Sequence, residues 1–66
     1  MIKYQYTISL EPSLLTLELN INNSSNISDN IQYSVWHQDY NNLELYFNNS
    51  LSSSEQIELS NIIRQL

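Results

Sequence analysis

Hydrophobic and polar side chains alternate without interruption over residues 2–11. One face carries Ile2, Tyr4, Tyr6, Ile8 and Leu10, and the other carries Lys3, Gln5, Thr7, Ser9 and Glu11. A two-residue period rich in aromatic and β-branched side chains is typical of a half-buried strand. Pro12 has no backbone N–H for a neighbouring strand and suits a turn. We therefore predict a strand over residues 2–11 that ends at this proline.

A second alternating run covers residues 14–21. Leu15, Leu17, Leu19 and Ile21 alternate with Thr16, Glu18 and Asn20. A helix is the alternative, because leucine and glutamate also favour helices. However, the apolar residues of this run, taken with Leu14, do not keep to one stripe at the helical period of about 3.6 residues. We therefore predict a strand here, joined to the first by an antiparallel hairpin.

Two more strands are predicted after the loop 22–30, which is rich in asparagine and serine. In residues 31–36 we expect Ile31, Tyr33 and Val35 to face the core and Trp36 to face outward. In residues 43–48 we expect Leu43, Leu45 and Phe47 to face the core, with Glu44 and Tyr46 outward. Residues 37–42 turn the chain between them. Since the chain contains no glycine, asparagine is expected to adopt any left-handed backbone at such turns.

The last segment predicts a helix that begins with a capping box. Ser52 can pair with Glu55, or Ser53 with Gln56. A core-facing stripe at helical spacing follows and consists of Leu59, Ile62, Ile63 and Leu66. Ile57 lies about 160° away from Leu59 around the helix axis. This isoleucine is either covered by the preceding loop or exposed for a partner.

These elements predict one small α+β domain over residues 1–66. Its architecture is a four-stranded antiparallel sheet in two hairpins, with one C-terminal helix packed on one face. A helix of about 13 residues covers one face of such a sheet incompletely. We therefore expect the uncovered part to contact a protein partner or a second copy of the chain.

Charge and composition exclude several classes of function. Seven acidic residues stand against Lys3 and Arg64, which gives a net charge of −5. Nucleic-acid binding needs clustered Lys and Arg, and so does binding to a membrane surface. There is no cysteine, and the single histidine, His37, has no second histidine or serine-elbow pattern beside it. We expect no enzyme activity, no cofactor, no metal site and no small-molecule substrate, and we interpret His37 as a turn residue.

The best candidates for partner contacts are four apolar or aromatic side chains that packing alone does not explain. They are Trp36, Tyr46, Tyr40 and Ile57. Trp36 and Tyr46 are expected side by side on the outward face of neighbouring strands. Trp and Tyr are frequent in the centres of protein interfaces. The alternative is that such a pair only stabilises the hairpin, by about 0.5–1 kcal/mol.

The second half of the chain shows a pattern seen elsewhere. Trp36 is followed by Leu43-Glu44-Leu45-Tyr46-Phe47 and then by Leu51-Ser52-x-x-Glu55-x-x-x-Leu59-x-x-Ile62-Ile63. This string resembles a strand-plus-helix module of small bacteriophage proteins that are often associated with the virion. The resemblance implies a non-enzymatic structural or assembly protein of the virion, such as a capsid decoration or a neck or tail accessory subunit. The alternative is a small acidic phage inhibitor that blocks a host enzyme or defence complex in the host cytoplasm.

Overall fold

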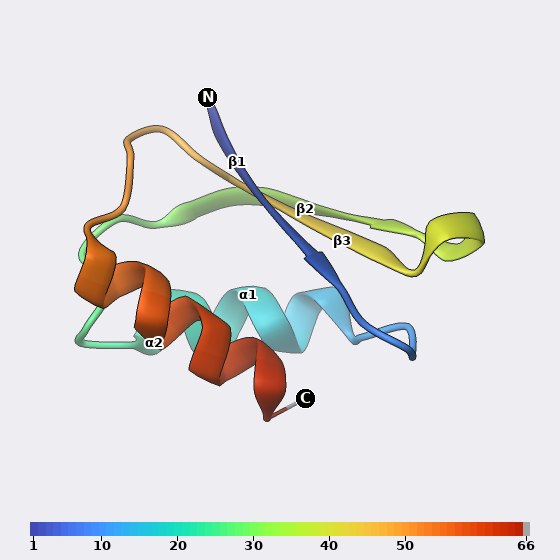
Figure 1. Ribbon diagram of the computed structural model, residues 1–66. Helices are drawn as coiled ribbons and strands as arrows, with labels where there is room; N and C mark the ends of the chain where they lie inside the picture. The colour runs from blue at the N-terminus through green and yellow to red at the C-terminus, as the bar shows by residue number, and fades with distance from the viewer. Residues whose placement is uncertain (66) are drawn as a thin grey trace.

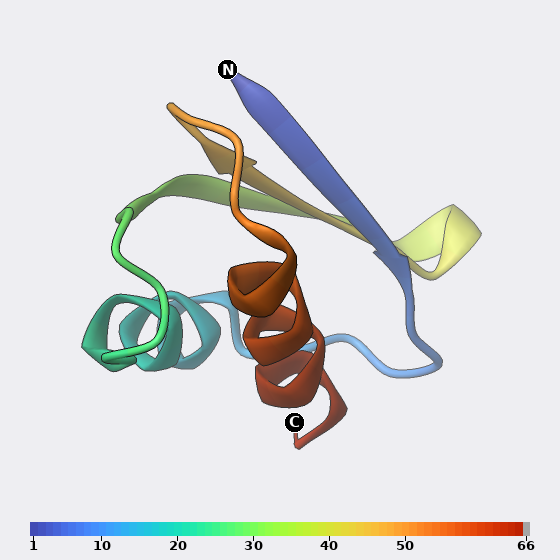
Figure 2. The same ribbon diagram turned by 60° about the vertical axis from the view of Figure 1, so that its left-hand side comes forward.

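A computed structural model describes residues 1–65 and shows one antiparallel sheet with both helices on the same side of it (Figures 1 and 2). The elements in chain order are β1 (Ile2–Thr7), α1 (Leu14–Asn23), β2 (Ile31–His37), a short 3₁₀ helix (Gln38–Tyr40), β3 (Asn42–Phe47) and α2 (Ser53–Arg64). Within residues 1–65 the strand order is β1-β3-β2. The prediction for Leu66 lies outside the described residues.

The predicted fold is right in its α+β class and wrong in its architecture. Over residues 1–65 the chain forms three strands and two α-helices, not four strands and one helix. Both β1 and β2 pair with β3 in antiparallel fashion, so β1 and β2 run parallel to each other. The connection between parallel strands needs a crossover, and α1 supplies it. The β1–α1–β2 unit is therefore split by β3, which enters between the two strands.

Residues 14–21, predicted as a strand, belong to the α1 helix. Ser13 caps its first turn, since its hydroxyl accepts a hydrogen bond from the Thr16 backbone N–H at 3.4 Å. Leu17 and Ile21 are fully buried, whereas Leu15 and Leu19 remain 71% and 53% exposed. A helical stripe therefore exists, but only part of the apolar set belongs to it. The helix was rejected wrongly because every apolar residue of the run was required to lie on one stripe.

The core is centred on the helix-facing side of β3. Leu43, Leu45 and Phe47 are fully buried there, as predicted. They pack in one cluster with Leu17 and Ile21 of α1 and with Leu59 and Ile63 of α2. Tyr4 of β1 closes this cluster at one side: its ring meets Phe47 edge-on at 5.9 Å, and its hydroxyl accepts the Leu51 N–H at 2.7 Å. The predicted strand 2–11 is shorter than expected, and Leu10 is 79% exposed.

A β-bulge in β2 reverses the faces predicted for the third strand. Ile31 pairs with Phe47 and Tyr33 pairs with Tyr46, so Gln32 is an extra residue without a partner on β3. The side chains after the bulge therefore change sides relative to Ile31. Tyr33 and Val35 share the outer face with Tyr46 and Glu44, and Trp36 shares the helix-facing side with Leu43. The predicted core positions of Tyr33 and Val35 are wrong for this reason.

The predicted capping box of α2 is confirmed for Ser52 and Glu55. The Ser52 hydroxyl accepts the Glu55 N–H at 3.2 Å, and the Glu55 carboxylate accepts the Ser52 N–H at 2.8 Å. Glu55 also accepts the backbone N–H and the hydroxyl of Ser28, each at 2.9 Å. These hydrogen bonds, that from the Ser52 backbone first, lower the pKa of Glu55 to about 2. One carboxylate thus fixes both the start of α2 and the loop after α1.

Two leucines of α1 distinguish the helix from the predicted strand. Leu17→Ala should lower the free energy of unfolding by about 2–5 kcal/mol, because it leaves a cavity at a fully buried site. Leu15→Ala, the matched control, should change it by about 0.5 kcal/mol or less, because that side chain is exposed. Urea denaturation followed by circular dichroism measures both. Equal losses for the two variants would contradict the helix.

The lowered pKa of Glu55 predicts a stability that depends on pH. Because the folded-state pKa lies below the ordinary value of 4.5, the contribution of Glu55 to stability is present above pH 4.5 and is lost as the pH falls toward 2. Glu55→Gln should therefore be less stable than the wild type at neutral pH, and this difference should shrink over that interval. Urea midpoints across the pH range provide the measurement. A difference that is independent of pH would rule out the charged capping role.

Candidate functional site

The side of the sheet opposite the helices is not covered by any element within residues 1–65 (Figures 1 and 2). Strand register places nine side chains on it in three rows: Lys3, Tyr46 and Tyr33; Gln5, Glu44 and Val35; Thr7, Asn42 and His37. We call this surface the open sheet face. Each row contains one residue from β1, one from β3 and one from β2.

Glu44 lies in the middle of the open sheet face and is contacted by three neighbours. One carboxylate oxygen accepts the Tyr46 hydroxyl at 2.7 Å. The other lies 3.3 Å from His37 Nε2 and 3.9 Å from Lys3 Nζ. The Tyr46 hydrogen bond, followed by His37 and Lys3, lowers the pKa of Glu44 against the opposing effect of burial. The same bond and burial raise the pKa of Tyr46 to about 12.

Tyr33 and Tyr46 form an aromatic platform beside this carboxylate. Their rings stack with centroids 4.4 Å apart and planes inclined by 17°. Tyr33 is 44% exposed, so the platform is open to solvent on the β2 side. Because Tyr46 also donates to Glu44, the platform and the carboxylate form one connected unit.

A shallow hollow lies at the other end of the open sheet face. Its volume is about 460 Å³, and its lining consists of Gln5, Thr7, His37, Tyr40, Asn42 and Glu44. Tyr40, in the turn after β2, is 76% exposed and has its ring 6.3 Å from that of His37. Aromatic side chains therefore border both ends of the face, with the charged cluster between them.

The four predicted contact residues do not form one surface. Tyr46 is on the open sheet face and Tyr40 is at its rim. Ile57 is 64% exposed on α2, in the helix layer. The first of its two predicted roles, an isoleucine covered by the preceding loop, is therefore wrong. Trp36 packs half-buried against the core, and its indole Nε1 is buried with no acceptor among the described residues. The predicted outward pair of Trp36 and Tyr46 is therefore wrong.

Sequence reasoning missed two residues of this site, Tyr33 and Glu44. Tyr33 was assigned to the core because the bulge at Gln32 leaves no mark on the apolar pattern. Glu44 was predicted to face outward with Tyr46, but it was given no role. The shared face was a usable signal for a contact between the two side chains, because they are two residues apart on one strand.

Most acidic side chains accept hydrogen bonds from the chain itself. Glu18 accepts from Ser34, Asp29 from the Asn49 N–H, Glu44 from Tyr46, Glu55 from Ser28 and Ser52, and Glu58 from Ser24. Among the described residues only Glu44 has basic neighbours within ion-pair distance. Hydroxyl and amide donors hold these carboxylates without neutralising their charge. Apart from Glu44, the acidic side chains are therefore not neutralised by a basic side chain within the described residues, and the net charge is −5.

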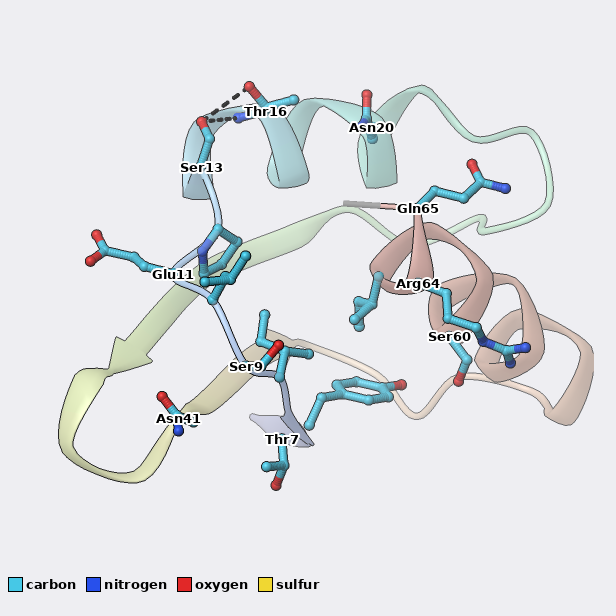
Figure 3. Close-up of a pocket in the computed structure, with 15 residues that line it drawn as sticks. Thr7, Ser9, Glu11, Ser13, Thr16, Asn20, Asn41, Ser60, Arg64 and Gln65 are labelled. Atoms are coloured by element: carbon cyan, nitrogen blue, oxygen red, sulfur yellow. Dashed lines mark hydrogen bonds between the residues drawn. The ribbon is translucent and has the colours of Figure 1, made fainter.

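A groove of about 1210 Å³ lies on the helix side of the sheet (Figure 3). The connector after β1 and the last turn of α2 form its walls, with Tyr6, Ile8 and Ile63 among its apolar lining. Glu11 and Arg64 are its charged residues, and Ser13 and Thr16 at its rim bond to each other. Among the described residues, its remaining polar lining is hydroxyls, amides and backbone.

Two further features are absent from residues 1–65, a metal-binding cluster and a membrane-spanning helix. These residues contain no cluster of three or more histidine and acidic side chains able to hold a metal ion. In the same part of the chain, neither helix has the length and apolar character needed to cross a membrane. Comparisons with protein-family models, curated proteins and solved structures gave no match to this chain. No relative therefore indicates a function for this chain.

The Tyr46–Glu44 hydrogen bond predicts one tyrosine that ionises late. Among the five tyrosines, Tyr46 should titrate near pH 12, because its hydroxyl donates to a carboxylate. Glu44→Gln should lower this pKa toward the ordinary value of 10.0, since the charged acceptor is lost. Carbon-13 NMR of the phenol Cζ atoms measures each ring, and Tyr46→Phe identifies the late signal. Titration of all five rings together in the wild type would contradict the contact.

Proposed function

We propose that this chain is a non-enzymatic structural or assembly protein of a bacteriophage particle that docks on a basic protein partner through the open sheet face. The observation that carries the proposal is the Tyr33–Tyr46 platform, which lies on the side of the sheet that no element within residues 1–65 covers. Tyrosine combines a large apolar ring with a polar tip and is enriched in the energetic centres of interfaces.

Charge supports a basic partner over a second copy. Each copy carries a net charge of −5, so two copies repel each other while a basic surface is attracted.

The area of the open sheet face also favours a different partner over a second copy. Strand spacing gives the open sheet face a footprint of roughly 300 Å², whereas a stable interface buries about 800 Å² on each partner. The face therefore suits a limited contact with a complementary protein more than an isologous dimer.

The phage setting is supported by the resemblance of the second half. In this chain β3 is followed by Leu51 and by the Ser52–Glu55 capping box, with Leu59 and Ile63 on the buried side of α2. This is the arrangement expected for the strand-plus-helix module of small virion-associated proteins. It supports a place in the virion, as a decoration subunit or as a neck or tail accessory.

A second candidate is a phage inhibitor that acts in the host cytoplasm. It is favoured by the uncompensated acidic charge on so small a chain, because such charge speeds association with a basic site on a host protein. Both candidates use the open sheet face. They differ in where the partner is found.

Mass spectrometry of purified phage particles separates the two candidates. The structural proposal requires the chain in the particle at a fixed ratio to the major capsid or tail proteins. Tyr33→Ala should reduce its incorporation roughly tenfold or more, because the variant removes half of the aromatic platform. Ile57→Ala is the matched control on the helix layer and should incorporate normally. Absence of the wild-type chain from particles would overturn the structural role and favour the inhibitor.

Folding of the variants is checked by circular dichroism before particles are analysed. Tyr33 and Ile57 are both well exposed, so each alanine variant should fold like the wild type. Loss of incorporation with Ile57→Ala and not with Tyr33→Ala would move the docking surface to the helix layer and contradict the open sheet face.

A further inference from the structure

We infer that the open sheet face recognises an arginine side chain, presented by an extended segment of the partner. The inference deepens the proposed function and rests on it, since it names the chemistry by which the same face would bind. Three features of the face carry it: a stacked aromatic platform, a carboxylate held rigidly next to that platform, and a lysine that occupies the carboxylate only weakly.

The platform offers a surface for a planar cation. Tyr33 and Tyr46 are stacked at 4.4 Å, so each ring uses one of its faces against the other. Tyr33 lies in the edge strand β2 and is 44% exposed, which leaves ring surface available to an incoming group. A guanidinium is flat and weakly hydrated and stacks on aromatic rings, whereas an ammonium is compact and strongly hydrated.

The carboxylate of Glu44 is placed to pair with the same guanidinium. Tyr46 holds one oxygen at 2.7 Å, so the acid is fixed directly beside the aromatic platform. The Tyr46 hydrogen bond, with His37 and Lys3 nearby, lowers the pKa of Glu44 below its ordinary value, so the carboxylate is charged at neutral pH. A guanidinium that stacks on the rings can therefore also donate to a carboxylate that is already oriented and ionised.

Lys3 occupies the second oxygen of Glu44 in a way that an arginine can displace. Its ammonium lies 3.9 Å from that oxygen, and its side chain is 44% exposed. Because the lysine is exposed and the distance is at the limit for an ion pair, the pair contributes little stability, although the Glu44 side chain is only 13% exposed. His37 lies closer to the same oxygen, at 3.3 Å, and belongs to β2, on the other side of β3 from Lys3. Lys3 therefore acts as a weak internal competitor for the site.

The size of the face selects an extended segment over a folded surface. A footprint of roughly 300 Å² matches a few residues of extended chain better than a domain. An acidic segment or a nucleic acid is disfavoured by the net charge of −5, and a second copy carries Lys3 and Arg64 as its only Lys and Arg residues. The occupant that fits both charge and size is a short segment of another protein that carries arginine.

The test is an NMR titration of the whole nitrogen-15-labelled chain with acetyl-Arg-Ala-Arg-amide. The lysine peptide and the neutral citrulline peptide of the same length serve as matched probes. We expect saturable shifts in the rows of Tyr33, Tyr46 and Glu44, strongest with arginine and weakened by physiological salt. Equal shifts with citrulline, or arginine shifts confined to the loop 24–30 and α2, would overturn the inference.

Three variants assign the binding to the named groups. Tyr33→Leu and Glu44→Gln should each weaken the arginine peptide about two- to fivefold. Lys3→Gln should instead tighten the binding of the arginine peptide about twofold, because the competing ammonium is removed. If the lost positive charge alone were the cause, the binding of the lysine peptide would tighten equally. Leu15→Ala, at an exposed position of α1, should leave the affinity unchanged. Unaltered affinity in both Tyr33→Leu and Glu44→Gln would contradict the arginine site.

The two proposals fail in different ways. If Tyr33→Ala abolishes incorporation into particles while arginine and citrulline peptides behave alike, the docking face stands and the arginine inference falls. If incorporation is unaffected by Tyr33→Ala, the docking face itself is wrong, whatever the peptides show.

Discussion

The buried side of β3 is the interaction on which the structure depends. Leu43, Leu45 and Phe47 are fully excluded from solvent, and covering them requires both helices on one side of the sheet. Within residues 1–65 no further helix or strand lies on the other side. The same requirement that forms the core therefore leaves the open sheet face uncovered. Core and candidate site are the two sides of a single strand.

Hydroxyl and amide donors replace salt bridges in this protein. With Lys3 and Arg64 as the only lysine and arginine, the acids at the start of α2 and in the loop after α1 accept from serine and backbone groups. Such bonds satisfy a carboxylate and leave its charge in place. Stability and a strong negative field are thus compatible here. The abundance of serine and asparagine has a structural reason as well as a compositional one.

The sequence predicted the second half of the fold well and the first half poorly. The inward positions of β3 and the Ser52–Glu55 box followed from spacing alone, because each depends on neighbours within a few residues. The α1 segment was ambiguous because Leu15 and Leu19 are exposed leucines, and exposure is decided by tertiary packing. Of the site, Tyr46 and the rim residue Tyr40 were identified. Tyr33 was missed because its place on the face depends on the bulge, and Glu44 because its contacts with Lys3 and His37 arise from pairing between strands.

The bulge at Gln32 connects this failure to the site itself. Without the extra residue, strict alternation would put Tyr33 on the same side as Ile31, in the core, and Trp36 on the open side. With it, Ile31 still packs against Phe47 while Tyr33 reaches Tyr46. A bulge also twists an edge strand and discourages its pairing with other strands. The unpaired Gln32 therefore places Tyr33 beside Tyr46 and turns Trp36 toward the helices. It also leaves the face of the sheet, more than the β2 edge, as the surface on which a partner can bind.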